Sequence, residues 1–178
     1  LYKSKYISLR SNRLTLEVRP SASIASSVAL PVEEFSDILK PQNISPDKVV
    51  EQTIIARQKS QWDQFFLYMD LESLLQKNPT LKRKYISSSA EERERMLVAY
   101  KADLMQSRIE NDIISIPSEF SIVETRYNPT EGTVSVIEWF QYPNFKEKKN
   151  YVYKIRQREG IWQIYDYTVT NLGTEWKF

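Results

Sequence analysis

The sequence predicts an α+β fold, with N-terminal helices packed on one face of a curved antiparallel meander sheet of four or more strands. Two observations predict it. Apolar residues recur with helical spacing between about residues 45 and 110, and the period changes to two after Pro117. Helices followed by consecutive strands are typical of α+β proteins, whereas strands that alternate with helices would indicate a parallel sheet.

The first two predicted helices are marked by their starting residues. Ser45 and Pro46 are typical of an N-cap and a first helical turn, and this helix is expected to run to about Lys59. Ser60 is interpreted as the N-cap of a second helix, because an apolar stripe follows at helical spacing. That stripe consists of Trp62, Phe65, Phe66 and Met69.

Two more helices are predicted before the sheet. A short one is expected over residues 71–77, followed by a loop that contains the basic run Lys82–Lys84. The segment Ser89–Glu92 is a capping box, in which a Ser and a Glu three residues later satisfy each other's backbone N–H groups. It predicts a helix that continues to about residue 110.

The C-terminal part predicts four strands, over residues 119–127, 133–142, 151–158 and 161–170. Loops are expected at 128–132 and 143–150, and a tight turn at Glu159-Gly160, where Gly supplies a positive φ. Because each strand follows its neighbour directly, the sheet is expected to be an antiparallel meander.

Residues 1–44 and 45–178 differ in pattern and predict an arm or linker followed by one folded domain. In the arm, segment 13–19 alternates like a strand and segment 32–39 forms a helical turn, with disorder as the alternative. The sequence begins at Leu1 without Met, which leaves open whether a signal, lipid anchor or membrane tether once preceded it. No apolar run reaches the roughly 18–20 residues that cross a bilayer.

The composition excludes several kinds of chemistry. The 178 residues include neither Cys nor His, which excludes disulfides, thiolate nucleophiles, zinc sites built from these ligands and imidazole bases. With only three Gly the chain has no phosphate-cradling loop. From these absences together we expect no metal and no cofactor. The formal net charge of +2 argues against a nucleic-acid partner.

The layout resembles the nuclear transport factor 2-like superfamily, whose cystatin-like fold is shaped like a cone. The resemblance rests on the opening segment Ser45–Val50, the aromatic segment Lys59–Phe66 and the terminal hairpin Arg158–Asp166. Two motifs, the helix Glu91–Leu104 and the segment Trp162–Phe178, are also similar to periplasmic phospholipid-shuttle proteins of the toluene-tolerance type. The superfamily contains enzymes, carriers and adaptors, so this resemblance implies a fold but no single function.

Enzymes of that superfamily often hold an Asp–His pair in the cone, and a chain without His cannot form one. A lone carboxylate remains a candidate base. Asp166 is predicted on the same strand face as Trp162, Ile164 and Thr168, and Glu138 is a second inward candidate. For both carboxylates an ion pair or a hydrogen bond is the alternative to catalysis, so no residue is assigned a catalytic role.

Aromatic side chains predict an apolar pocket between helices and sheet, suited to a lipid or another hydrophobic ligand. The ligand-pocket candidates are Trp62, Phe65, Phe66, Tyr100, Phe140, Trp162 and, at the rim, Asp166. The alternative is that these side chains simply fill the core.

Two further groups of residues suggest surfaces. Lys154, Arg156 and Arg158 alternate along one strand face and form a basic patch, which either contacts anionic groups or pairs with acidic neighbours. On the open face of the sheet, exposed apolar groups would mark an interface with a protein partner or a second copy of the chain. The interface candidates are Ile137, Trp139, Tyr151 and Tyr153.

The sequence leaves three functional hypotheses. The leading one is a non-catalytic accessory or protein-interaction domain of the bacterial cell envelope or periplasm. The second is a carrier of a lipid or small hydrophobic ligand, and a stoichiometric co-purified ligand would favour it. The third is a carboxylate-dependent isomerase or hydrolase, which requires Asp166 or Glu138 for turnover.

Overall fold

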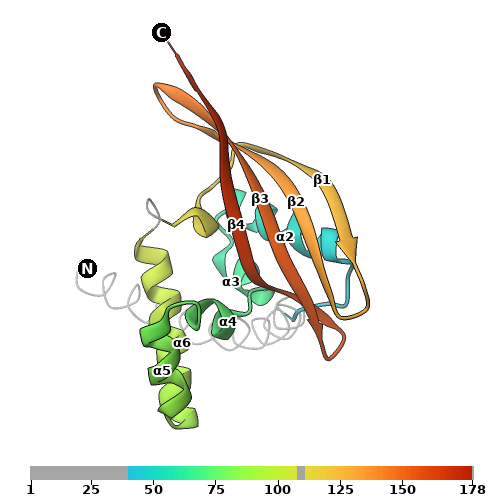
Figure 1. The fold of residues 1–178 in the computed structure, drawn as a ribbon. Coiled ribbons are helices and arrows are strands. Elements are labelled where there is room, and N and C mark those ends of the chain that lie inside the picture. The colour runs from blue at the N-terminus through green and yellow to red at the C-terminus, as the bar shows by residue number, and fades with distance from the viewer. Residues whose placement is uncertain (1–39, 108–110, 178) are drawn as a thin grey trace, which may run out of the picture. The chain divides into compact units, whose positions relative to one another are not determined.

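In the computed structural model, which describes residues 40–107 and 111–177, helices precede an antiparallel sheet (Figure 1). The helical elements of this part are α2 (Pro46–Gln58), α3 (Trp62–Leu67), α4 (Leu71–Leu75), α5 (Pro79–Ser87), α6 (Ala90–Gln106) and the 3-10 helix η1 (Asp112–Ile114). The strands are β1 (Glu119–Tyr127), β2 (Glu131–Gln141), β3 (Phe145–Arg158) and β4 (Ile161–Trp176). The strand predicted at 13–19 and the turn predicted at 32–39 lie outside the described residues.

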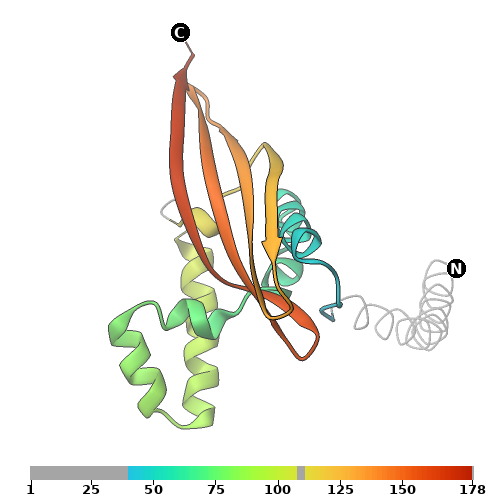
Figure 2. The same ribbon diagram turned by 45° about the vertical axis from the view of Figure 1, so that its right-hand side comes forward.

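The four strands form one open antiparallel sheet in the order β1-β2-β3-β4, which is a meander. Figure 2 shows the helices on one side of this sheet, and the end where β4 finishes extends beyond them. We call the helix-facing side the inner face and the opposite side the outer face. The predicted α+β fold class, with helices packed on a meander sheet, is confirmed.

Helix α2 begins as predicted, with Ser45 at the N-cap and Pro46 in the first turn. The prediction that Ser60 caps the next helix is wrong. Ser60 has a positive φ of 55°, and the N–H of Gln61 bonds to the carbonyl of Ala56 at 2.8 Å. This is a closing motif of a helix C-terminus. Ser60 therefore ends α2, and α3 starts at Trp62 with Gln61 as its N-cap.

The basic run Lys82–Lys84 lies in helix α5 rather than in the predicted loop. Asn78 caps this helix, because its side-chain oxygen accepts bonds from the N–H groups of Thr80 and Leu81. A Pro in the first turn costs no hydrogen bond, so the Asn-Pro pair that ends one helix also starts the next. The capping box at Ser89 is confirmed, with both of its reciprocal bonds present.

The charged segment 143–150 is mostly strand, not loop, and β4 runs six residues past its predicted end to Trp176. At this end of the sheet Lys146 pairs with both Gln141 and Glu175. All residues of this segment are exposed or half-buried, so no apolar alternation is needed. The sequence pattern that reveals a half-buried strand is therefore missing here.

The hydrophobic core lies between the inner face of the sheet and helices α2, α3 and α4. Helix α2 contributes Val49, Val50 and Ile54, which are fully buried. The inner face contributes Val134, Val136, Phe140, Tyr151, Tyr153, Ile155, Trp162 and Ile164. None of the described helices combines the length and the apolar character needed to span a membrane.

Candidate partner-binding face

The outer face of the sheet carries two of the predicted interface residues. Ile137 and Trp139 alternate with the inward-facing Val136, Glu138 and Phe140 along β2, and both are half-buried. The described helices all lie on the other side of the sheet (Figure 2). The side chain of Lys148, on the neighbouring strand β3, partly covers the indole ring of Trp139. Its ammonium lies 5.6 Å from the ring centroid.

The other two predicted interface residues are in the core. Tyr151 and Tyr153 are 0% and 1% exposed, and their rings stack with centroids 5.7 Å apart. In the register of the sheet Tyr151 lies opposite Val136, which faces the helices. These tyrosines therefore cannot belong to the outer face, and their prediction as interface residues is wrong.

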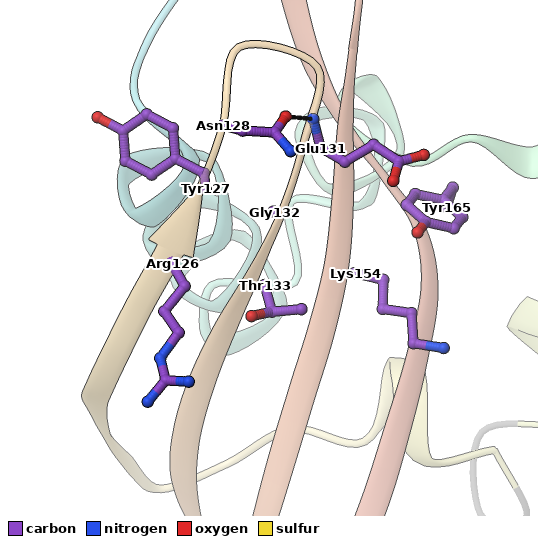
Figure 3. A pocket seen from close by; sticks show the side chains of 8 residues that line it. All are labelled: Arg126, Tyr127, Asn128, Glu131, Gly132, Thr133, Lys154 and Tyr165. Atoms are coloured by element: carbon purple, nitrogen blue, oxygen red, sulfur yellow. Dashed lines mark hydrogen bonds between the residues drawn. The ribbon is translucent and has the colours of Figure 1, made fainter.

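A hollow of about 540 Å³ lies at one end of the sheet, next to the β1–β2 hairpin. We call it the hairpin hollow, and its lining residues come from all four strands and the hairpin turn. They are Arg126, Tyr127, Asn128, Glu131, Gly132, Thr133, Lys154 and Tyr165 (Figure 3). Arg126, Thr133 and Lys154 lie opposite one another in register, and Thr133 points to the same face as Ile137. The hollow therefore opens on the outer face.

The turn that shapes the hairpin hollow depends on two residues. The side-chain oxygen of Asn128 accepts bonds from the N–H groups of Thr130 and Glu131, both at 2.9 Å. A Cβ atom added to Gly132 would lie 2.5 Å from the Cβ of Tyr127, which is closer than side chains approach. Only glycine lets the two strands come this close.

The cations of the hairpin hollow already have acidic partners. Arg126 is 2.7 Å from Glu124, and Lys154 is 3.3 Å from Asp166. The ring of Tyr165 lies under the guanidinium of Arg156, with its centroid 4.7 Å away. The hollow thus offers the ring of Tyr165 and balanced charges, which is closer to a protein-contact surface than to a site for a bare anion.

The predicted basic patch is neutralised by two aspartates. Arg156 contacts Asp70 at 2.6 Å, and Arg158 approaches the same carboxylate at 3.6 Å. Burial acts to raise the pKa of Asp70, but hydrogen bonds from Arg156 and Ser73 outweigh it and bring the pKa below its ordinary value. Because Lys154 also has a carboxylate partner, the patch carries little free positive charge.

Asp166 lies on the outer face, not on the inner face where it was predicted. In the register Ile155 is opposite Ile164 and Lys154 is opposite Asp166, so Tyr165 is an extra residue in a β-bulge. A bulge shifts every later residue of the strand to the other face. There Asp166 is paired with Lys154 and Lys77. Burial acts to raise its pKa, but these lysines and the backbone N–H of Tyr167 lower the pKa overall.

Glu138 does point inward, and it belongs to a buried ionic cluster. Its carboxylate accepts a bond from Arg57 at 2.7 Å and another from the hydroxyl of Tyr153. Glu138 is fully buried and Arg57 is only 1% exposed. Among the described residues, the second carboxylate oxygen of Glu138 has no hydrogen-bond partner. Through its contact with Arg57, the side chain of Glu138 links β2 to helix α2.

The protonation states of this cluster follow from its geometry. Burial alone would lower the pKa of Arg57, but Tyr153 and the Glu138 carboxylate raise it above its ordinary value. Burial raises the pKa of Tyr153 well above its ordinary value, although the charge of Arg57 opposes the shift. Arg57 is thus a cation and Tyr153 a neutral donor. Arg57 was not among the predicted site residues, although its spacing from Val50, Thr53 and Ile54 places it on the buried face of α2.

The predicted ligand-pocket aromatics lie on the inner side of the sheet, where the ring of Trp162 packs on that of Tyr127 with centroids 5.8 Å apart. Phe65, Phe66, Phe140 and Trp162 are buried in the core, and Trp62 and Tyr100 are half-buried against it. They pack on one another: the rings of Trp62 and Phe65 are 5.8 Å apart, and those of Phe65 and Phe66 are 5.0 Å apart. None of these six side chains lines the hollow. Within residues 40–107 and 111–177, no cluster of three or more acidic side chains is arranged to hold a metal ion.

Comparison with known families corrects the resemblance that the sequence suggested. A family model for the flagellar collar protein C, C-terminal domain, matches residues 47–175, and no curated protein matches the chain. The assignment to the nuclear transport factor 2-like superfamily, and the weaker one to phospholipid shuttles, is wrong because this model covers the same helices and the same terminal hairpin. Those motifs describe helices followed by a meander, and unrelated families share that arrangement. Since the match spans most of the sequence, the chain belongs to the flagellar collar protein C, C-terminal domain, family.

Proposed function

We propose that this domain is a non-catalytic structural module of the flagellar collar, and that it binds another protein of that assembly through the outer face of its sheet. Membership of the flagellar collar family carries the proposal. It also supports the location at the bacterial cell envelope that the sequence analysis favoured.

The state of the candidate carboxylates supports a structural role. A general base needs a carboxylate that can reach a substrate and accept its proton. The carboxylate of Glu138 is buried between Arg57 and Tyr153, and that of Asp166 is held by two lysines. Both act as partners in ion pairs that join separate elements of the fold.

The outer face has the character of a contact surface. Ile137 and Trp139 supply apolar area, and the hairpin hollow supplies the ring of Tyr165 beside charged side chains. Protein interfaces combine an aromatic and apolar centre with a polar rim in this way. A partner that covers Trp139 and inserts a side chain into the hollow would bury both features together.

Substitution of Ile137 and Trp139 by lysine tests this proposal in cells that build the collar. Both side chains are half-buried on the outer face, so the double variant is expected to fold but to be absent from the collar. Its folding is checked by circular dichroism, and its location by imaging a fluorescent fusion at the flagellar base. The matched control is Val98→Lys on α6, where the valine is 66% exposed. Normal incorporation of the folded double variant would refute the proposed surface.

The carrier hypothesis makes a different prediction about the same protein. A carrier retains lipid in the space between helices and sheet, where this chain has packed aromatic rings. We expect organic extraction of the purified chain, followed by mass spectrometry, to yield less than one lipid per ten chains. A stoichiometric lipid would favour the carrier and would count against a purely structural module.

A further inference from the structure

We propose that two copies of this chain pair along the free half of strand β4, so that two sheets join edge to edge in an antiparallel homodimer. Edge strands expose unpaired backbone N–H and C=O groups that can accept another strand. The proposal concerns an edge of the sheet and is independent of the outer-face contact proposed above.

Only the first part of the β4 edge has a neighbour. Met69 and Ile164 form a parallel bridge, in which Ile164 donates to the carbonyl of Tyr68 and accepts from the N–H of Asp70, both at 2.8 Å. Among the described residues, no backbone bond from the rest of β4 leads away from β3 until Lys177. Figure 2 shows β4 at the left edge of the sheet, with no drawn helix beside its upper half.

The composition of the free half favours a second copy over a charged partner. The segment 168–174 carries no charged residue and is rich in β-branched side chains. Edge strands that must stay single usually carry charges, lysine above all, and this stretch has none. Two copies of an uncharged strand do not repel each other. In a two-fold dimer both chains use the same edge, so this strand can pair with its own copy about an axis near its centre.

The side chains of this segment also leave apolar area for a partner. Leu172 is 50% exposed and Trp176 is 62% exposed. In the register Trp176 lies opposite Phe145 and Val169 opposite Tyr151, so both point to the inner face. Antiparallel pairing centred between residues 172 and 173 would set Trp176 of one copy opposite Val169 of the other, both on the inner face, which is the kind of cross-strand pair that stabilises sheets.

The opposite edge of the sheet provides the comparison. Strand β1 also has a bulge, at Val123, and this residue is 62% exposed. The nine residues of β1 include the charged Glu119, Glu124 and Arg126. Leu172 is the extra residue of the bulge in β4, between Asn171 and Gly173. The two edges thus share a bulge with an exposed apolar side chain and differ in charge, which makes Val123 a matched control for Leu172.

The oligomeric state of the full chain tests the proposal. Sedimentation at micromolar to millimolar concentration is expected to give twice the chain mass of 21.1 kDa. Leu172→Lys sets two like charges together at the axis and is expected to weaken the dimer at least about tenfold, because like charges repel one another in an interface. Val123→Lys is expected to leave it unchanged. A wild-type chain that stays monomeric, or a dimer that survives Leu172→Lys, would overturn the proposal.

Cross-linking locates the contact. Because the chain has no Cys, a single introduced thiol gives an unambiguous disulfide. Leu172→Cys is expected to form a covalent dimer under mild oxidation, because its two copies lie beside the axis within disulfide reach. Val123→Cys is expected to remain uncross-linked under the same conditions. Equal cross-linking of both variants, or of Val123→Cys alone, would show that the copies meet elsewhere.

Discussion

At the scale of single residues, the buried cluster of Arg57, Glu138 and Tyr153 decides how α2 sits on the sheet. One guanidinium bonds to the carboxylate of Glu138, to the hydroxyl of Tyr153 at 3.0 Å and to the backbone carbonyl of Ser115 at 2.8 Å. Few apolar contacts are so directional, and a helix packed by Val and Ile alone could slide. We infer that the cluster fixes the register of α2 and contributes little net stability, as is common for buried ion pairs.

Removing one member of this cluster is expected to cost far more than removing all of it. Arg57→Met leaves the Glu138 charge buried and unpaired, so we expect a loss of about 3–5 kcal/mol in the free energy of unfolding. Adding Glu138→Leu and Tyr153→Phe removes the stranded polar groups and is expected to restore most of that loss. Urea titration measures both values.

The exposed pair on α6 is the control for this comparison. Arg95 contacts Glu91 at 2.5 Å, but both side chains are about three-quarters exposed. Arg95→Met is expected to change stability by less than about 1 kcal/mol, because solvent screens such pairs. If Arg57→Met lowered the free energy of unfolding no more than Arg95→Met does, the inference that the buried cluster fixes the register of α2 would be wrong.

The depressed pKa of Asp70 predicts part of the acid sensitivity. Its folded-state pKa lies below the unfolded value of about 3.9, so the carboxylate stabilises the fold above about pH 4. That stability is lost as the pH falls through about 4 towards the folded-state pKa. Asp70→Asn is expected to be less stable at pH 6 but to lose less between pH 5 and pH 3, as measured by the urea midpoint.

Asp63 provides the matched control for this pH dependence. Its side chain is 83% exposed and its nearest cation, Lys101, is 3.6 Å away. Because solvent screens this exposed pair, Asp63→Asn is expected to change the free energy of unfolding by less than about 1 kcal/mol. If the wild-type chain lost no more stability between pH 5 and pH 3 than Asp70→Asn does, Asp70 would not contribute to the acid sensitivity.

At the scale of elements, the β1–β2 hairpin shows how one glycine shapes a surface. Gly132→Ala would force its Cβ to within 2.5 Å of Tyr127 and 2.7 Å of the Arg126 carbonyl, so the strands must separate. We expect a loss of about 1–3 kcal/mol, typical of overpacking. Gly173 has open space around it, so Gly173→Ala is expected to stay within about 0.5 kcal/mol of wild type. Thermal or urea unfolding compares the two, and equal losses would mean that close approach at Gly132 does not matter.

The elements also show which signals the sequence carries. Capping residues predicted the starts of α2 and α6, and alternation predicted β1 and β2, because these signals act within a few residues. The bulge at Tyr165 could not be predicted, since one extra residue in β4 depends on how β3 pairs with it. That single residue moves Asp166 to the outer face. The site residues that depend on long-range pairing were therefore the ones misplaced, whereas Ile137 and Trp139 were placed correctly by local alternation.

At the scale of the whole domain, the described helices differ in how firmly they are held. Helix α2 has seven buried residues, whereas α5 buries only Tyr85 and α6 only Leu104. Figures 1 and 2 show α5 and α6 reaching past the end of the sheet opposite to the one where β4 finishes. A segment with few buried apolar contacts opens at a lower free energy than the core. We therefore expect two cooperative units within this domain, a core of α2 with the sheet and a looser α5–α6 hairpin.

Native-state hydrogen exchange would measure this difference directly. Amides of α2, β2 and β3 are expected to exchange only by global unfolding, whereas those of α5 and the first half of α6 exchange through a smaller opening that depends little on urea. Leu104→Ala is expected to lower protection in α6 by about 2–5 kcal/mol while leaving α2 unchanged, because its side chain is packed where the hairpin meets the core. Uniform protection across all helices would mean that the domain unfolds as one unit. If the outer face is the contact surface, binding of a collar partner should add protection in β2 and β3 and none in the α5–α6 hairpin.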